Sequence, residues 1–483
     1  MSMYYPSTMY LGTKKIFAVW MTAALLLSLS YPIVAQDSKK EIFPPTYKIK
    51  LALSNLPLLT PVDPISIIKH SYNYNYISNM KQASLKITSD NNLLVSFFTP
   101  DKQSLQSTQI NPAEENNQSL AYNIVQPLPP IVDKAKWDKV VQQSYKNGII
   151  KTVVPGVKHI VIKKYTKRGI ISINVLEINP ALNSNISIEP ALAGTTLANK
   201  KKVSAMVKEN KAIAGINATF FKPSNGIPLG TMIINQELVT GPVYNRVTLG
   251  IKDNKFAMAR ISLQGKLISA NGTSIKIDNV NQPRMSVAHN ILYSYKWGKI
   301  SPITPKYGLQ VCVDNGKVVE ISKKSLLIPK SGFVLVGTEK SFSALKVNDQ
   351  INISFSTTPN WTGVNHAVSG GPYLIKDGQI FVDTFAQKFG PISGLNPRTA
   401  VGYTKDNRFI MITVDGRQKG SIGLTLNDLA KLMKEFGCYN AMNFDGGSST
   451  QMYVNNKVVN NPLNKGGNMV GSGLIVKVSK NEV

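Results

Sequence analysis

The chain has 483 residues, of which 43% are hydrophobic and 17% are charged, and its formal net charge is +28. This composition is that of a globular protein with at least one large hydrophobic core and a second, smaller unit. The excess of positive charge favours anionic partners, although it could serve solubility alone. Because the lysines are scattered, as at 200–202 and 323–324, and no basic patch is interleaved with aromatic residues, the charge does not indicate a nucleic-acid-binding protein.

The first 35 residues have the pattern of a signal peptide. Lys14 and Lys15 precede an uncharged apolar run at 16–29, and Ala35 is a suitable cleavage position. The run is shorter than the ~20 residues that span a bilayer, so an uncleaved membrane anchor is the weaker alternative. Cleavage would leave a chain with a net charge of +26 and no stable membrane span. We therefore expect an exported protein, periplasmic or extracellular, whose anionic partners are envelope polymers, acidic polysaccharides or lipid headgroups.

Residues 36–150 differ in composition from the rest of the chain. They are rich in Asn, Ser and Pro, as at 111–119 and 126–130, which is typical of linkers and loosely ordered segments. Residues 84–98 alternate well enough to predict a short hairpin. We expect a small or partly disordered N-terminal module or spacer without a catalytic role.

A tighter pattern begins near residue 151. Residues 159–164 and 170–177 are rich in Ile and Val and predict a hairpin. A short helix at 203–211 and a strand at 212–216 follow, and this strand ends at Asn217. The stretch from about 240 to 355 is a succession of short β segments separated by Gly and Asn turns.

Residues 399–450 give the strongest local prediction. Segments 399–403 and 408–414 predict a hairpin, and apolar residues then recur at helical spacing from Leu426 to Phe436. Thr425 with Asp428 resembles a capping box, and Gly437 occupies the position of a left-handed C-cap. The next strand would be 440–444.

A strand, a helix and a strand of these lengths predict a right-handed crossover between two parallel strands. Each strand is followed at once by an aspartate, Asp415 after Val414 and Asp445 after Phe444. Parallel strands end at the same edge of a sheet, where ligands of α/β proteins tend to bind. We therefore expect the two carboxylates to share a site.

The segment NFDGGSST, residues 443–450, is unusual for a packed core. Gly446 and Gly447 would let the backbone approach a ligand and turn amide hydrogens toward an anion, and the three hydroxyls of Ser448, Ser449 and Thr450 would add donors. A solvent-exposed turn is the alternative for such a segment taken alone.

Five segments in order resemble the phosphodiester glycosidase family. They are GINATFF at 215–221, SGGP at 369–372, NPRTAVG at 396–402, VDGR at 414–417 and NFDGGSST at 443–450. The resemblance covers about 155–478 and implies an α+β catalytic domain at 151–483, a mixed β-sheet with packed helices, that hydrolyses a sugar-1-phosphodiester. The chain departs from many relatives by having two glycines instead of three after Asp445, and Asn396 where His is frequent.

The resemblance and the residue chemistry together suggest roles for the charged residues. Asp445 and Asp415 would act as nucleophile or general base and as general acid or stabiliser of an oxocarbenium ion, in an order that the sequence leaves open. A structural Asx turn is the alternative for each aspartate. Arg398 and Arg417 could bind phosphate in a bidentate manner, with Arg246 as a weaker third candidate.

Several uncharged residues complete the predicted site. Asn217 and Asn443 could donate hydrogen bonds to sugar hydroxyls, or be buried amides that satisfy neighbouring backbone. Gly370 and Gly371 predict another loop that approaches a ligand closely. His366 lies near this loop, but we expect it to be structural or peripheral.

Neither a metal site nor a disulfide is predicted. The sequence shows no requirement for a cofactor and no EF-hand, although carboxylates around a Gly-rich loop could hold a hard cation such as calcium. Cys312 and Cys438 could form one disulfide or remain as two buried thiols. Two alternatives to the phosphodiester hydrolase stay open, namely a non-catalytic protein that binds anionic cell-envelope polysaccharide, and a hydrolase of ordinary glycosides without phosphate.

Overall fold

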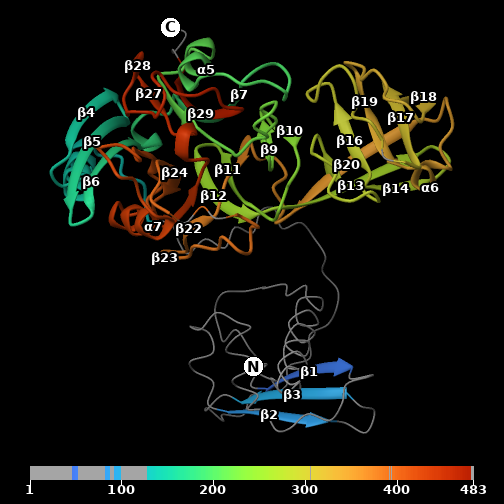
Figure 1. Ribbon diagram of the computed structural model, residues 1–483, viewed down its shortest axis with the longest axis horizontal. Helices are drawn as coiled ribbons and strands as arrows, with labels where there is room; N and C mark the ends of the chain where they lie inside the picture. Colours follow the sequence, from blue (N-terminus) through green and yellow to red (C-terminus); the bar gives the residue numbers. More distant parts are fainter. Residues whose placement is uncertain are drawn as a thin grey trace, which may run out of the picture. The chain divides into compact units, whose positions relative to one another are not determined.

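The structure is a computed structural model in which residues 128–304, 306–390, 392 and 394–479 are described together with their side chains (Figure 1). Before residue 128 it describes the backbone of β1 (Thr46–Ala52), β2 (Gln82–Ile87) and β3 (Asn92–Phe98). These strands form an antiparallel sheet in the order β1-β3-β2, so the hairpin predicted at 84–98 is confirmed. The predicted signal peptide lies outside the described residues.

The chain divides into two compact units, residues 1–116 and 117–483. The second unit begins earlier than the boundary expected near residue 150, because helix α4 (Lys134–Ser144) is part of its core. Trp137 of this helix is 1% exposed and donates a hydrogen bond from Nε1 to Glu177 Oε1 at 3.0 Å. Glu177 also pairs with Arg408 at 2.6 Å, so the buried carboxylate is compensated.

The largest sheet has eight strands in the order β23-β22-β26-β24-β25-β6-β5-β4, with antiparallel neighbours throughout. The strands are β4 (Ile149–Val154), β5 (Val157–Thr166), β6 (Gly169–Ile178), β22 (Tyr373–Lys376), β23 (Gln379–Ile380), β24 (Arg398–Tyr403), β25 (Phe409–Val414) and β26 (Asn440–Asn443). The hairpin predicted at 159–177 is confirmed by β5 and β6, and the one predicted at 399–414 by β24 and β25.

Two five-stranded antiparallel sheets share a core with one face of the eight-stranded sheet. One has the order β28-β27-β8-β29-β7 and the other the order β10-β9-β21-β11-β12. The strands of the first are β7 (Ile186–Leu192), β8 (Ala214–Asn217), β27 (Met452–Val454), β28 (Lys457–Val458) and β29 (Ser472–Val478), and a short helix α5 (Val203–Glu209) packs on this sheet. Those of the second are β9 (Met232–Ile234), β10 (Glu237–Thr240), β11 (Val247–Lys252), β12 (Lys255–Arg260) and β21 (His366–Ser369).

The alternation along β25 shows why the eight-stranded sheet is covered on both faces. Phe409 and Met411 belong to the core shared with the other two sheets. Ile410, Ile412 and Val414 belong to the core formed with α4 and with α7 (Leu426–Glu435). Successive side chains of a strand point to opposite faces, so a strand that is buried along its whole length needs a partner layer on each side.

The predicted crossover is present in a modified form. Strands β25 and β26 run parallel, but β24 lies between them and is antiparallel to both. Helix α7 connects them, with Thr425 Oγ1 accepting the backbone N–H of Asp428 at 3.1 Å and Gly437 at φ 86° after its end. The start of β24, at Arg398, therefore lies between the ends of β25 and β26.

Residues 262–358 form an inserted module between β12 and β21, drawn in yellow and light orange in Figure 1. Its sheets have the orders β14-β13-β20 and β15-β16-β19-β17-β18, and they enclose a separate hydrophobic core. Its elements are β13 (Ser262–Ser269), β14 (Ser274–Ile277), β15 (Asn279–Val280), β16 (Ile291–Ser294), β17 (Gly308–Asp314), β18 (Lys317–Ser322), β19 (Gly332–Thr338), α6 (Glu339–Phe342) and β20 (Ile351–Thr358).

The fold is a mixed α+β architecture in which sheets dominate. Cys312 lies in the inserted module and Cys438 lies just before β26, and both are buried free thiols. Within the described residues, no helix has the length and apolar character needed to cross a membrane.

Candidate active site

Asp445 lies where the eight-stranded sheet meets the sheet that contains β8. Its backbone N–H donates to the carbonyl of Ala218 at 3.1 Å, and its own carbonyl accepts from Asn217 Nδ2 at 2.7 Å. Asn217 is the last residue of β8 and Ala218 follows it, whereas Asp445 follows β26. The residue is thus anchored by backbone on two sheets, which leaves its side chain to be positioned by the loop that follows.

The glycines after Asp445 allow a tight approach of two backbones. A Cβ atom on Gly446 would lie 2.8 Å from the carbonyl oxygen of Pro397, and Gly447 has φ 59° and donates its N–H to the same oxygen at 2.9 Å. A short 3-10 turn, η2 (Gly447–Ser449), follows. The Gly446 N–H and the Ser449 hydroxyl both hydrogen-bond the Asp445 side chain. Of the other two predicted donors, Ser448 is exposed, whereas Thr450 is buried with Oγ1 unpaired.

The carboxyl group of Asp445 has an unusual proton affinity. Burial raises its pKa to about 6, and the hydrogen bonds from Ser449 and Gly446, together with the charge of Arg246, oppose this rise. A carboxyl group that changes its charge near neutral pH in a partly open position is typical of a catalytic residue.

Arg246 is the cation whose charge acts on this carboxylate. Its Cζ lies 4.8 Å from the ring centroid of Phe220, 5.3 Å from that of Tyr244 and 4.6 Å from that of Phe389. Nη1 donates to the carbonyl of Leu229 at 3.3 Å, and Nε is buried without a partner. Burial lowers the pKa of Arg246 to about 10, while Tyr244 and Asp445 oppose the change. A buried guanidinium with an N–H group that lacks a hydrogen-bond partner favours the binding of an anion.

The backbone just before Arg246 is strained. Tyr244 and Asn245 both have φ 55°, a region that a bulky residue such as Tyr rarely adopts. The loop is held by two hydrogen bonds from the inserted module, Asn279 Nδ2 to the carbonyl of Pro242 at 2.8 Å and the Gly241 N–H to the carbonyl of Val280 at 2.9 Å. Strain of this kind persists where the surroundings impose it, and it is found preferentially at functional sites.

Asp415 lies at the same edge of the sheet as Asp445, but its oxygens are occupied by protein groups. It is 4% exposed, and it accepts from Asn460 Nδ2 at 2.9 Å and from the Asn461 N–H at 3.0 Å. Asn460 in turn accepts the N–H of Met452 at 2.8 Å and donates to the carbonyl of Thr450 at 3.3 Å. These contacts favour a positioning role, in which Asp415 supports the segment after Asp445. The catalytic role predicted for Asp415 stays a prediction.

Replacing Asp415 by Ala should therefore destabilise the protein. The change would leave the Asn461 N–H and one N–H of Asn460 buried without an acceptor, which costs about 2 to 3 kcal/mol. We expect a lower unfolding midpoint in urea, compared with wild type and with the Asp445→Asn variant. An unchanged midpoint together with lost turnover would instead assign Asp415 to the chemistry.

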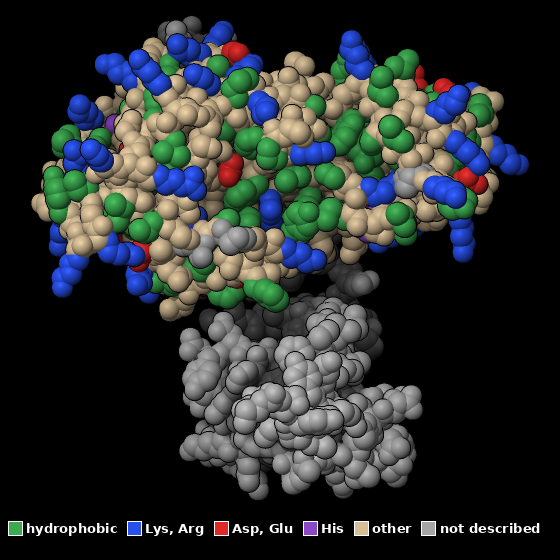
Figure 2. All heavy atoms as spheres, viewed as in Figure 1, with side chains coloured by type: hydrophobic (Ala, Val, Ile, Leu, Met, Phe, Trp, Pro, Cys, Tyr) green, Lys and Arg blue, Asp and Glu red, His purple; other side chains and the backbone are tan. Residues whose placement is uncertain are grey.

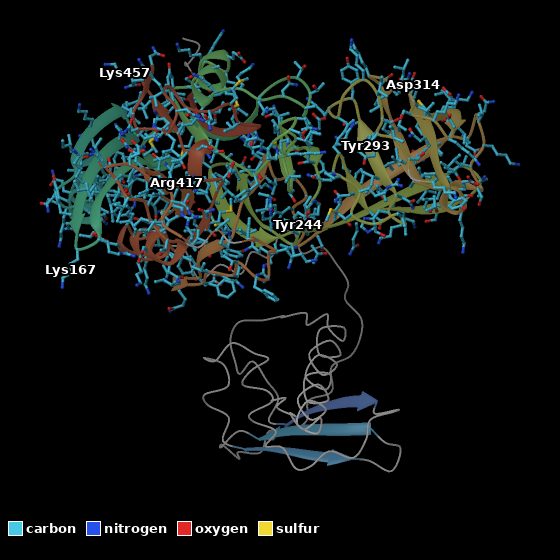
Figure 3. All side chains as sticks on the ribbon, in the orientation of Figure 1. Lys167, Tyr244, Tyr293, Asp314, Arg417 and Lys457 are labelled. Carbon is cyan, nitrogen blue, oxygen red and sulfur yellow. The ribbon has the colours of Figure 1, made fainter. Side chains whose placement is uncertain are left out.

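The two arginines predicted as main phosphate ligands differ in their exposure and in the hydrogen bonds that their guanidinium groups make. Arg398 is 3% exposed and donates from Nε to the carbonyl of Leu424 and from Nη2 to the carbonyls of Ile392 and Gly394. Arg417 is exposed, and its Nε and Nη2 both donate to Asn396 Oδ1, so Asn396 holds this arginine. A Cβ on Gly447 would lie 3.7 Å from Arg417 Nη1, which places the guanidinium over the loop after Asp445 (Figure 3).

The uncharged predicted residues also lie around Asp445, with limited spare hydrogen-bonding capacity. Asn217 Oδ1 accepts from Thr399 Oγ1 at 2.8 Å and from the Gln451 N–H at 3.1 Å, which favours the buried-amide interpretation. Asn443 is 1% exposed and donates to the carbonyl of Gly371 at 3.0 Å, while its Oδ1 is unpaired. Its direct role stays a prediction.

Gly370 and Gly371 bring β21 next to β26. The Gly370 N–H donates to the carbonyl of Val247 at 2.9 Å and the Gly371 N–H to that of Asn443 at 2.6 Å. A Cβ on Gly370 would lie 2.5 Å from the carbonyl oxygen of Asn443. His366 is at the opposite end of β21, where it lies 3.9 Å from Glu189.

The sequence reasoning missed the aromatic residues around Arg246. Phe220 is part of the segment GINATFF and Tyr244 is two residues from Arg246, so both could have been considered. Phe389 lies in a loop after β23 that has no periodicity, and its place beside Arg246 follows only from tertiary packing.

Comparison with known proteins supports the assignment that the motifs suggest. A family model described as phosphodiester glycosidase matches residues 307–477. The SPbeta prophage-derived uncharacterized protein YomE of Bacillus subtilis (strain 168) is 33% identical over 125 residues, which are 26% of this chain and 18% of that protein. The N-acetylglucosamine-1-phosphodiester alpha-N-acetylglucosaminidase of Mus musculus is 29% identical over 106 residues, which are 20% of each chain. The chain thus matches about a fifth of the length of these relatives.

A solved structure shows the same fold over most of the chain. A hypothetical protein from Synechocystis superposes with a TM-score of 0.63 and 19% sequence identity, covering 82% of this chain and 72% of that one. Residues 307–477 match the phosphodiester glycosidase family, and the resemblance inferred from the motifs is confirmed.

No group of three or more His, Cys, Asp or Glu side chains that could hold a metal ion occurs in the described part of the chain. The charge of Arg246 acting on the buried carboxyl group of Asp445 is the feature that distinguishes this site.

Proposed function

We propose that this protein is an exported hydrolase that cleaves a sugar-1-phosphodiester in an envelope glycan or exopolysaccharide. The observation that carries the proposal is the electrostatic effect of Arg246, a desolvated cation among three aromatic rings, on Asp445, a carboxyl group of raised pKa. The family match supports the class of reaction. Export, which places the substrate outside the cytoplasm, is inferred from the pattern of residues 1–35.

The chemistry follows from what each group can do. Arg246, with Arg417 at the edge of the site, would bind the phosphate oxygens and stabilise the charge that develops on them as the bond between the anomeric carbon and oxygen breaks. The aromatic faces would contact the apolar face of the sugar ring. Asp445 would act in its ionised form, either by adding to the anomeric carbon or by removing a proton from the attacking water. Water supplies the hydroxyl of the free sugar, and its proton goes to the phosphomonoester that leaves.

Phosphate specificity is the property to test first. Residues 36–483 should hydrolyse the methyl phosphodiester of α-N-acetylglucosamine-1-phosphate about 10³-fold faster than the methyl glycoside of the same sugar, because the guanidinium groups act only on the charged substrate. Released sugar can be quantified for both substrates and for their glucose analogues. Equal rates would favour an ordinary glycosidase, and binding of glycans without turnover of any substrate would favour a non-catalytic binding protein.

A further inference from the structure

Exposed apolar side chains gather around the entrance to the site. Tyr244 is 36% exposed, and its ring also contacts Arg246. Phe385 is 95% exposed. The Phe389 N–H donates to the carbonyl of Thr384 at 3.0 Å, which closes a turn that contains Phe385. The ring of Phe389, at the end of this turn, contacts Arg246. Tyr244 and the loop that carries Phe389 both contact Arg246, and both also expose apolar side chains to solvent.

Leu395, from the same connection as Phe385, and one further loop add exposed apolar side chains. Leu395 is 37% exposed and follows Gly394, whose carbonyl accepts from Arg398 at 2.7 Å. Met285 and Val287 are 49% and 68% exposed, and they lie in the loop between β15 and β16 of the inserted module.

The loop between β15 and β16 is tied directly to the segment that contacts Arg246. Gln282 Nε2 donates to the carbonyls of Pro228 at 3.3 Å and Gly230 at 3.1 Å, and Arg246 donates to the carbonyl of Leu229 between them. We call Tyr244, Met285, Val287, Phe385 and Leu395 the apolar rim. Figure 2 shows hydrophobic side chains gathered near the centre of the visible face, in the region where Figure 3 labels Tyr244.

Five large apolar side chains on three loops around one site are unfavourable in water. Single exposed apolar residues are ordinary, but a group at the mouth of a binding site indicates an apolar partner. The surroundings are cationic, because Lys388 and Arg417 are exposed beside the same loops and the whole chain carries +28. Apolar side chains among cations are the pattern of a protein that lies on an anionic lipid surface.

We propose that the apolar rim seats the protein on an anionic membrane and that the aglycone of its substrate is a lipid. This inference rests on the proposed function, and it specifies which glycosyl phosphodiesters are cleaved. The sugar and phosphate would enter between Asp445 and Arg246, while the chain beyond the phosphate runs along the rim into the bilayer. The cleaved bond would then lie at the level of the lipid headgroups.

The test compares two substrates and two surfaces. Substrates are the methyl and dodecyl phosphodiesters of α-N-acetylglucosamine-1-phosphate, the dodecyl ester being inserted in phosphatidylglycerol–phosphatidylcholine vesicles. Binding of the full mature chain to the same vesicles is measured by co-sedimentation. The variant is Phe385→Ser, with Val287→Ser as a second rim variant. Leu327→Ser is the matched control, because Leu327 is 73% exposed on the inserted module and outside the rim.

We expect the dodecyl ester to be the better substrate. Each rim variant should lower kcat/KM for the dodecyl ester and the vesicle affinity by about tenfold, which is the loss of one partly inserted apolar side chain, and leave the methyl ester unaffected. Leu327→Ser should change neither. Equal kcat/KM for both esters in wild type, or equal vesicle binding by the rim and control variants, would overturn the inference while leaving the phosphodiester glycosidase activity intact. Vesicle binding that depends on Phe385, without turnover of either ester, would retain the membrane surface and reject the proposed function.

Discussion

Replacing Asp445 by Asn should reduce kcat for a sugar-1-phosphodiester by on the order of 10³-fold or more, because the variant lacks the carboxylate that adds to the anomeric carbon or accepts the proton of water. The amide keeps the size of the side chain and can still accept from the Gly446 N–H and the Ser449 hydroxyl. Substrate binding should therefore be largely preserved. Single-turnover rates and direct binding measured on the same preparation separate the two effects.

The pH dependence gives an independent check on Asp445. Because its pKa is about 6 and the ionised form is required, kcat/KM of the wild type should rise as the pH increases through 6. A profile that falls through the same range would assign the protonated carboxyl as a general acid. The absence of any inflection near this pH would remove Asp445 from the chemistry.

The raised pKa of Asp445 also predicts that its contribution to stability falls over the pH range in which activity rises. The pKa of Asp445 is about 6 in the folded protein against an ordinary value of 3.8, so the folded state holds the proton more tightly than the unfolded state. The contribution of Asp445 to the free energy of unfolding therefore falls as the pH rises through this window, by on the order of 3 kcal/mol. Asp445→Asn should raise the unfolding midpoint above about pH 6 and leave it nearly unchanged below about pH 4.

The second large effect is expected for Arg246→Met. Methionine fills a similar volume among Phe220, Tyr244 and Phe389 but removes the positive charge, so kcat/KM for the phosphodiester should fall by about 10²- to 10³-fold. Because the variant also removes a buried Nε without a partner, the free energy of unfolding should be unchanged or higher.

Two comparisons make the Arg246 result specific. Arg417→Met, which removes an exposed guanidinium held by Asn396, should lower kcat/KM by only about tenfold, since exposed charges are screened. A neutral glycoside, if it binds at all, should bind the wild type and Arg246→Met equally. Loss of affinity for the neutral ligand as well would indicate that Arg246 supports the shape of the site instead of contacting phosphate.

Local patterns predicted the elements around the site well. The hairpins, the capped helix α7 and the strand that ends at Asn217 all depend on interactions between residues close in the sequence, such as Thr425 with Asp428. The common edge for Asp415 and Asp445 followed from the parallel crossover, and the insertion of β24 between the two strands does not change that edge.

The division of roles among the predicted residues required the tertiary structure. Arg398 was predicted to be a stronger phosphate ligand than Arg246, yet Arg398 donates to three backbone carbonyls and Arg246 keeps a buried Nε without a partner. Asp415 and Asp445 are both followed by glycine in the sequence, but only Asp415 has its oxygens filled by Asn460 and Asn461. Spacing places a residue at an edge, but it does not reveal which hydrogen-bonding partners surround it.

By itself, the sequence determined the family, the order of the strands and helices near the site, and the edge at which Asp445 lies, because these depend on short motifs and on the periodicity of neighbouring residues. Only the tertiary structure decided that Phe220, Tyr244 and Phe389 surround Arg246, and that loops from the inserted module and from residues 384–395 form the apolar rim. The contact between Phe389 and Arg246 joins residues 143 positions apart, and such partners are selected by the packing of separate elements, which no local pattern encodes.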